Sequence, residues 1–141
     1  MQKRRELMAQ TNEPLLSVKG LKQYFPVSKK FTVRAVDNIS FDIYPGETYG
    51  LVGESGSGKS TTGRSIIRLY DPTEGTILFN GEDISKKLTA KQEKMLRSDM
   101  QMVFQDPMAS LNPHKKILDT IAMGLDAHHP HMDQKERVER V

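Results

Sequence analysis

A glycine-rich segment between an apolar run and a helix-compatible stretch most constrains how this chain folds. Residues 53–60 read Gly-Glu-Ser-Gly-Ser-Gly-Lys-Ser, which fits the pattern G-x-x-x-x-G-K-[ST]. The apolar run Thr48–Val52 before it predicts a buried strand. A helix is predicted from Lys59 to about Leu69, because Pro72 disfavours its continuation. This order of strand, loop and helix predicts a phosphate-binding loop on a parallel α/β sheet.

The residue types in this loop suit a polyphosphate ligand. Gly53, Gly56 and Gly58 let the backbone wrap tightly with its N–H groups pointing inward. The helix that begins near Lys59 presents unsatisfied N–H groups and a positive dipole end to the same anion. Lys59 adds a charge for the β- and γ-phosphates, and the Ser60 hydroxyl is a hard oxygen ligand that suits Mg²⁺. The alternative is a glycine-rich turn that binds nothing, which the strand-to-helix context disfavours.

Two further features are candidates for the same site. Gln105 follows the apolar run Met100–Phe104, which predicts a second buried strand. The end of such a strand lies at the ligand-binding edge of a parallel sheet, where an amide reaches Mg²⁺ or an attacking water. Taken alone, a polar residue that merely ends a strand is the more frequent reading. The ring of Tyr24 or Phe25 is a candidate for stacking on adenine, with a core or edge aromatic as the alternative.

The composition excludes several classes of protein. The chain has 141 residues, room for one domain, and no Cys, which rules out a disulfide-stapled fold, a thiolate metal site and a cysteine nucleophile. Its net charge of +3 is too small to indicate nucleic-acid binding. No apolar run predicts a membrane-spanning helix, and the charged start does not predict a signal peptide. The cluster His128, His129 and His131 is interrupted by Pro130, and a solvated loop is favoured over a metal site.

Local patterns predict the remaining elements. Alternating apolar residues predict a strand around Leu16 and Val18 and another over 33–44, joined through a solvated turn at 28–30 and followed by a Pro45-Gly46 turn. A third strand over 76–79 is closed by Asn80-Gly81. Capping boxes at 89–92 and 133–136 open predicted helices, and another helix covers 117–125. The last helix runs to Val141 with apolar residues that need a partner, so we expect a chain that is cut short.

The sequence resembles the ATP-binding subunits of ABC importers for oligopeptides and dipeptides. The resemblance covers nearly the whole chain from residue 15, and the segment that ends in Ser-Leu-Asn-Pro is typical of the peptide-importer group. It is carried by five segments: Leu15–Val27, Ala35–Phe41, Gly50–Thr61, Gly75–Gly81 and Gln101–Pro113.

The resemblance implies roles for residues that match the family's motifs. Gln105 resembles the glutamine that senses Mg²⁺ and the γ-phosphate, so Ser60 and Gln105 are the implied Mg²⁺ ligands. The aromatic adenine platform is Tyr24 or Phe25, between which the sequence does not decide. The implied cofactors are ATP and Mg²⁺. The implied nucleotide-binding residues of the loop are Gly53, Glu54, Ser55, Gly56, Ser57, Gly58, Lys59, Ser60 and Thr61.

The sequence departs from the family in what it lacks. The 141 residues contain no Ser-Gly-Gly-Gln signature and no apolar strand that ends in Asp-Glu. We therefore expect the N-terminal half of such a subunit, with an incomplete three-layer α/β P-loop core, an N-terminal antiparallel β part and no complete catalytic site. The expected organisation is a flexible N-terminus over 1–14, the β part and P-loop core over 15–105, and the start of a helical subdomain over 106–141.

The leading hypothesis is a subunit that couples ATP hydrolysis to peptide import. It implies membrane permease subunits and a second ATP-binding subunit as partners, a cytoplasmic location on the inner face of the cell membrane, and neither nucleic-acid binding nor membrane insertion. These residues are expected to bind nucleotide without turning it over, because the general base and a metal ligand are missing. The alternatives are a stand-alone P-loop kinase or GTPase, although no Asn-Lys-x-Asp guanine motif is present, and a non-enzymatic half-subunit that binds the permease or a partner ATPase.

Overall fold

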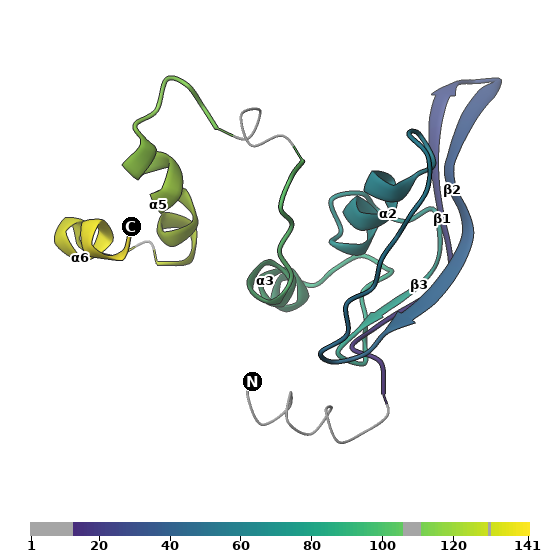
Figure 1. The fold of residues 1–141 in the computed structure, drawn as a ribbon, viewed down its shortest axis with the longest axis horizontal. Coiled ribbons are helices and arrows are strands. Elements are labelled where there is room, and N and C mark those ends of the chain that lie inside the picture. The colour runs from purple at the N-terminus through teal and green to yellow at the C-terminus, as the bar shows by residue number, and fades with distance from the viewer. Residues whose placement is uncertain (1–12, 106–110, 130) are drawn as a thin grey trace. The chain divides into compact units, whose positions relative to one another are not determined.

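The structure of the chain is a computed structural model that describes residues 13–105, 111–129 and 131–141. It forms two compact units, Met1–Gln101 and Met102–Val141, each of which is described below by itself (Figure 1). Most of the predicted flexible N-terminus lies outside the described residues. The three-part domain organisation expected from the sequence stays a prediction.

An antiparallel sheet is the scaffold of the first unit. It consists of β1 (Leu16–Ser28), β2 (Phe31–Ile43), β3 (Glu74–Phe79) and β4 (Glu82–Asp83) in the order β2-β1-β3-β4. β1 and β2 form a long hairpin, and β1 also pairs with β3 (Figure 1). This sheet confirms the predicted antiparallel part, the two strands that the alternating apolar residues indicated and the third strand before Asn80-Gly81.

The turns and the core follow from the residues that the strands carry. Asn80 and Gly81 both have positive φ, 52° and 75°, which is the conformation that a tight hairpin turn between β3 and β4 requires. One set of strand side chains points to the interior, where burial of apolar area supplies the main stabilisation. The buried core consists of Leu16, Val18, Leu21, Val36, Ile77, Phe79, Ile84 and Leu96.

Helix α2 (Lys59–Ile66) lies against the β1–β2 hairpin (Figure 1). A buried polar contact links the two elements, because the hydroxyl of Ser65 lies 3.2 Å from Oε1 of Gln23 and 2.9 Å from the carbonyl oxygen of Thr61. Both Gln23 and Ser65 are buried, so this contact orients α2 from within the interior. The helix ends three residues earlier than the predicted Leu69, at a turn in which Arg68 has a φ of 59°.

Helix α3 (Ala90–Asp99) begins with the capping box that the sequence predicts. The backbone N–H of Gln92 donates to the hydroxyl of Thr89, and the Gln92 side chain accepts from the Thr89 backbone N–H. The side-chain Nε2 of Gln92 also donates to the carbonyl oxygen of Asp83 at 3.2 Å. The same residue therefore caps α3 and ties its first turn to β4.

Two predicted strands are wrong in this structure. Neither Thr48–Val52 nor Met100–Phe104 belongs to a strand, and the side chains of Val52 and Val103 are 93% and 97% exposed. All strand pairs among the described residues are antiparallel, whereas a buried parallel strand needs neighbours that crossover connections bring alongside it. An apolar cavity of about 370 Å³ lies between Leu51 and α2. The apolar run is present in the sequence, but no described segment pairs with it.

The second unit contains α5 (Ile117–His128) and α6 (Gln134–Arg140). Arg137 joins the two helices, because its Nε and Nη2 donate to both carboxylate oxygens of Asp126 at 2.9 and 3.1 Å, and it also donates to Asp119. This guanidinium holds the pKa of the Asp126 carboxyl below its usual range. Asp133 caps α6 through the amides of residues 135 and 136, as predicted. Within the described ranges, no helix is long and apolar enough to cross a bilayer.

Candidate nucleotide-binding site

The backbone of the phosphate loop lies in close contact with β2 at Gly58. This residue has a φ of 89°, and a Cβ atom built on it would lie 2.3 Å from the carbonyl oxygen of Ala35. Both the left-handed conformation and the close approach of two backbones require glycine here. The glycine that the motif demands is therefore the contact point between the loop and the hairpin.

Lys59 organises the inside of the loop. Its ammonium donates to the carbonyl oxygens of Gly53 and Glu54 at 2.8 and 2.6 Å and to the hydroxyl of Ser57 at 3.2 Å. An ammonium has three hydrogen-bond donors, so the loop itself supplies an acceptor for each. The amide of Ser57 also donates to the carbonyl oxygen of Glu54, which closes the turn. Oxygens of the loop itself therefore hold the ammonium of Lys59 in place.

The first turn of α2 leaves donors for a ligand. No side chain caps this helix, and its first internal bond runs from the amide of Thr62 to the carbonyl oxygen of Gly58. The amides of residues 59–61 therefore have no intrahelical acceptor, and they carry the positive end of the helix dipole. The hydroxyl of Ser60 is exposed and makes no hydrogen bond within the described part of the chain. It fits the role of an oxygen ligand to Mg²⁺.

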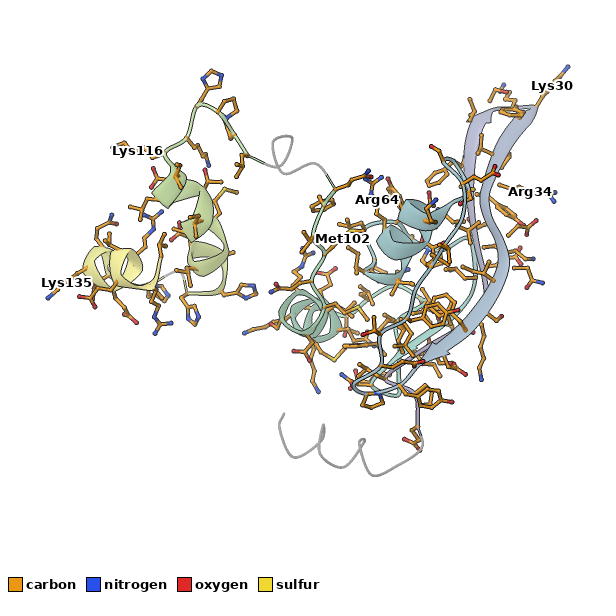
Figure 2. All side chains as sticks on the ribbon, viewed as in Figure 1. Lys30, Arg34, Arg64, Met102, Lys116 and Lys135 are labelled. Carbon is orange, nitrogen blue, oxygen red and sulfur yellow. The ribbon has the colours of Figure 1, made fainter. Side chains whose placement is uncertain are left out.

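A cleft of about 470 Å³ runs between this helix turn and β2. Gly56–Thr61 form one wall and Val33–Ala35 the other. Figure 2 labels Arg34, on β2, and Arg64, on the helix α2 that begins at this cleft. The cleft brings the predicted loop residues 56–61 together; Gly53, Glu54 and Ser55 belong to the same loop but do not line it.

The two aromatic candidates have different surroundings. The ring of Phe25 packs edge-on against Tyr70, with centroids 5.3 Å apart. The hydroxyl of Tyr24 donates to Asp37 at 2.5 Å, and the guanidinium of Arg34 lies 5.4 Å from the Tyr24 ring centroid. Neither ring lines the cleft. The hydrogen bond to Asp37 raises the pKa of Tyr24.

Gln105 lies outside the unit that contains the phosphate loop. Gln105 is exposed and belongs to the second unit, so its predicted place beside Ser60 stays a prediction. The segment that follows it, 106–110, lies outside the described residues. His128, His129 and His131 are exposed, and the described residues contain no group of three or more His, Cys, Asp or Glu that could hold a metal ion.

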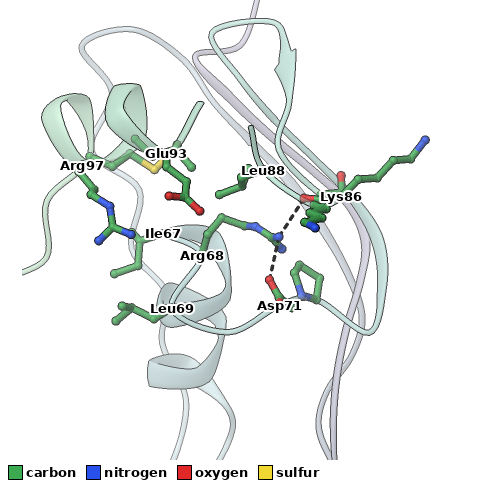
Figure 3. A pocket seen from close by; sticks show the side chains of 13 residues that line it. Ile67, Arg68, Leu69, Asp71, Lys86, Leu88, Glu93 and Arg97 are labelled. Atoms are coloured by element: carbon green, nitrogen blue, oxygen red, sulfur yellow. Dashed lines mark hydrogen bonds and ion pairs between the residues drawn. The ribbon is translucent and has the colours of Figure 1, made fainter. Parts of the chain in front are cut away.

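A larger cavity of about 790 Å³ lies where α2 ends and contains none of the predicted site residues (Figure 3). Arg68 crosses it with a side chain that is only 3% exposed, and Nη2 donates to Asp71 at 2.9 Å and to the carbonyl oxygen of Lys86 at 3.0 Å. This guanidinium joins the end of α2 to the segment after β4. The cavity shares no lining residue with the cleft at the phosphate loop.

Comparison with known proteins agrees with this geometry. The sequence profile of the ABC transporter family matches residues 36–141. The chain belongs to the ABC transporter family. It is 57% identical over 129 residues to the oligopeptide transport ATP-binding protein OppF of Bacillus subtilis, which covers 92% of this chain and 42% of OppF. It is 47% identical over 129 residues to the dipeptide transport ATP-binding protein DppF of Lactococcus lactis, covering 90% of this chain and 41% of DppF.

Solved structures place this ABC chain among ATP-binding cassettes. The fold is similar to the cassette MJ0796 in a post-hydrolysis dimer bound to ADP and Pi, with a TM-score of 0.75, 26% identity, and coverage of 89% of this chain and 53% of that one. It is also similar to cbiO1 of Clostridium perfringens, with a TM-score of 0.65, 26% identity, and coverage of 92% and 48%. The predicted fold class, an incomplete ABC ATPase core, is confirmed. The chain spans less than half the length of the curated relatives named above.

Sequence reasoning missed the wall of the cleft that β2 provides. Arg34 and Ala35 do not belong to the phosphate-loop motif. They line the cleft because the hairpin places them beside residues 56–61. A signal was available in the register, because Arg34 is the cross-strand partner of Tyr24. Counting outward from the predicted turn at 28–30 pairs these two residues approximately, although the ladder contains bulges that shift the count.

We predict that Gly58→Ala destabilises this chain and removes nucleotide binding. A Cβ would collide with the carbonyl oxygen of Ala35 at a left-handed backbone position, so the loop must separate from β2. The expected cost in the free energy of unfolding is about 2 kcal/mol or more, measured by urea denaturation. Gly50→Ala is the matched control, because Gly50 has no atom near its Cβ position and no positive φ. Equal stability of the two variants would show that the contact is unimportant.

A second prediction concerns the titration of Tyr24. Because its pKa is raised by Asp37, the neutral phenol is favoured in the folded state. This contribution to stability is fully present below the ordinary pKa of 10.0 and is lost as the pH rises through the raised value. Asp37→Ala should return the pKa of Tyr24 toward 10.0, as followed by tyrosinate absorbance, with Tyr24→Phe used to assign the signal. Asp42→Ala, at another exposed carboxylate of β2, should leave that titration unchanged.

Proposed function

We propose that this chain is the nucleotide-binding part of an ATP-binding subunit that couples ATP hydrolysis to peptide import. The observation that carries the nucleotide site is the cleft in which the uncapped start of α2 and the ammonium of Lys59 face one ligand volume. The peptide cargo rests on the names of OppF and DppF, to which the chain is 57% and 47% identical. Membership of the ABC family favours this function over a stand-alone kinase or GTPase.

ATP binds with its phosphates at the loop and its base toward the hairpin. The phosphate oxygens accept from the amides of residues 59–61 and from Lys59, which exchanges its bonds with the carbonyls of Gly53 and Glu54 for the anion. Ser60 is the proposed Mg²⁺ ligand within the loop, and Gln105 is proposed as the residue that senses Mg²⁺ and the γ-phosphate. Bound Mg²⁺ neutralises charge on the phosphates. Tyr24 and Phe25 both remain candidates for the adenine platform, because neither ring lines the cleft.

The expected result is nucleotide binding that depends on Lys59. A fluorescent ATP analogue should bind in the presence of Mg²⁺, and Lys59→Ala should weaken it by about tenfold or more, because a charge-assisted contact to phosphate is lost. Lys91→Ala removes a charge of the same kind from α3 and should leave the affinity unchanged. Binding that is absent, or that survives Lys59→Ala undiminished, would contradict the proposal. These 141 residues should show no ATP turnover above that of Lys59→Ala, because they contain no Asp-Glu pair that could activate water.

The proposed partners are membrane permease subunits and a second ATP-binding subunit, which would hold the chain at the inner face of the cell membrane. The support on this chain is the exposed apolar surface of α5, where Ile117 and Ile121, about one helical turn apart, are 79% and 55% exposed. Exposed apolar side chains that lie close together on a helix indicate a contact surface for another protein. A half-subunit that only binds the permease would use the same surface.

Co-purification tests this assignment. The chain carrying an affinity tag should retain peptide-permease subunits expressed with it, and Ile121→Glu should abolish the retention, because a charge would be buried in the contact. Val27→Glu places the same charge on the hairpin, where Val27 is 65% exposed, and should leave retention intact. Retention that both substitutions leave unchanged would exclude α5 as the contact.

A further inference from the structure

The buried guanidinium of Arg68 uses only part of its hydrogen-bonding capacity. Its side chain is 3% exposed, and both of its hydrogen bonds, to Asp71 at 2.9 Å and to the carbonyl oxygen of Lys86 at 3.0 Å, are made by Nη2. A guanidinium carries five N–H donors, and within the described part of the chain neither Nε nor Nη1 has a partner. A buried donor without an acceptor is costly, most of all on a charged group. An acceptor brought to Nε or Nη1 would therefore be held strongly.

The turn that ends α2 fixes the place from which this side chain starts. Arg68 has a φ of 59°, a left-handed conformation that long side chains rarely adopt. The amide of Arg68 donates to the carbonyl oxygen of Ser65 at 3.1 Å, and the amide of Leu69 donates to that of Arg64 at 2.9 Å. The guanidinium is thus held by a hydrogen-bonded turn at its root and by Asp71 and Lys86 at its tip, so little order has to be created when an anion arrives.

The cavity of about 790 Å³ that Arg68 lines has the size and character of a site for a small organic anion. Four cationic side chains line it against two acidic ones, so its lining is positive overall. Figure 3 shows Lys86 and Leu88 beside the guanidinium. The rest of the lining is largely apolar, and its apolar residues are Ile67, Leu69, Pro72, Leu88, Leu96 and Met100.

We propose that this cavity binds a small organic acid, whose carboxylate accepts from the free donors of Arg68 and whose apolar body packs against the apolar lining. A guanidinium suits a carboxylate in a poorly hydrated place, because it is itself weakly hydrated. Burial of the body supplies the remaining affinity, which inorganic phosphate has no means to gain. The head group reaches Arg68 when the exposed Lys86 or the half-buried Leu88 rotates, and rotations of this kind are fast.

This site is independent of the proposed nucleotide site, because the cavity and the cleft at the phosphate loop have no lining residue in common. The test titrates the unmodified chain with hexanoate, with hexanol, which has the same tail without the charge, and with inorganic phosphate. The readouts are the NMR signal of the Arg68 Nε–H group and the temperature of unfolding. Hexanoate should shift the signal saturably and raise the unfolding temperature, whereas hexanol and phosphate at equal concentration should do neither.

Substitution of Arg68 identifies the residue that reads the head group. Arg68→Met keeps an unbranched side chain without the charge, assigns the Nε–H signal by its loss, and should weaken hexanoate by about tenfold or more. Arg64→Met is the matched control, because Arg64 belongs to the same helix but does not line the cavity, and it should leave the hexanoate affinity unchanged. Circular dichroism reports whether each variant folds, and the titration of the unmodified chain decides alone if Arg68→Met does not.

Four results would overturn this site. They are an Arg68 signal that hexanoate leaves in place, an equal response to hexanol, an equal response to phosphate, and a folded Arg68→Met variant that binds hexanoate as tightly as the unmodified chain. Binding of the fluorescent ATP analogue is measured on the same samples. If that binding does not depend on Lys59, the nucleotide site fails and the Arg68 site stands. If it does depend on Lys59 and hexanoate gives any of the four results, only the Arg68 site fails.

Discussion

The approach of Gly58 to the carbonyl oxygen of Ala35 is the contact on which the rest of the site depends. It leaves no room for a side chain, since a Cβ would come within 2.3 Å of that oxygen. Ala35 belongs to the β2 wall of the cleft and Gly58 to its loop wall. A single backbone contact therefore sets the spacing of these two walls. The buried pair Gln23 and Ser65 supports it from the interior, where a misplaced hydrogen bond would be costly.

Most local elements of this chain could be predicted from the sequence because their signals are local. The capping box at Thr89, the turn at Asn80-Gly81 and the alternation in β1 each involve residues within a few positions of one another. The phosphate loop is predictable for the same reason, because eight consecutive residues carry its chemistry. The wall formed by Arg34 was not predictable in this way. It depends on a ladder register with several irregularities, which no single segment of the sequence specifies.

The two predicted strands that the structure does not contain, Thr48–Val52 and Met100–Phe104, show what a local pattern cannot predict. The apolar run that ends at Val52 is a reliable sign of burial, but burial in a parallel sheet is a property of several strands together. Among the residues that the structure describes, no strand pairs with that run, and Val52 and Val103 are almost fully exposed. An apolar pattern specifies that a segment needs cover without specifying what covers it. The antiparallel hairpin could be predicted because its two strands, β1 and β2, are separated by only a short turn along the chain.

The ammonium of Lys59 is held in place by the phosphate loop itself, and this arrangement suits a polyphosphate ligand. Lys59 is satisfied by three oxygens of its own loop, so the loop keeps its shape around a charge before any anion arrives. An entering phosphate replaces carbonyl acceptors with stronger anionic ones, and little of the backbone has to be ordered in the process. A charge that is fixed in this way suits phosphates, whose place the free amides at the start of α2 would also set.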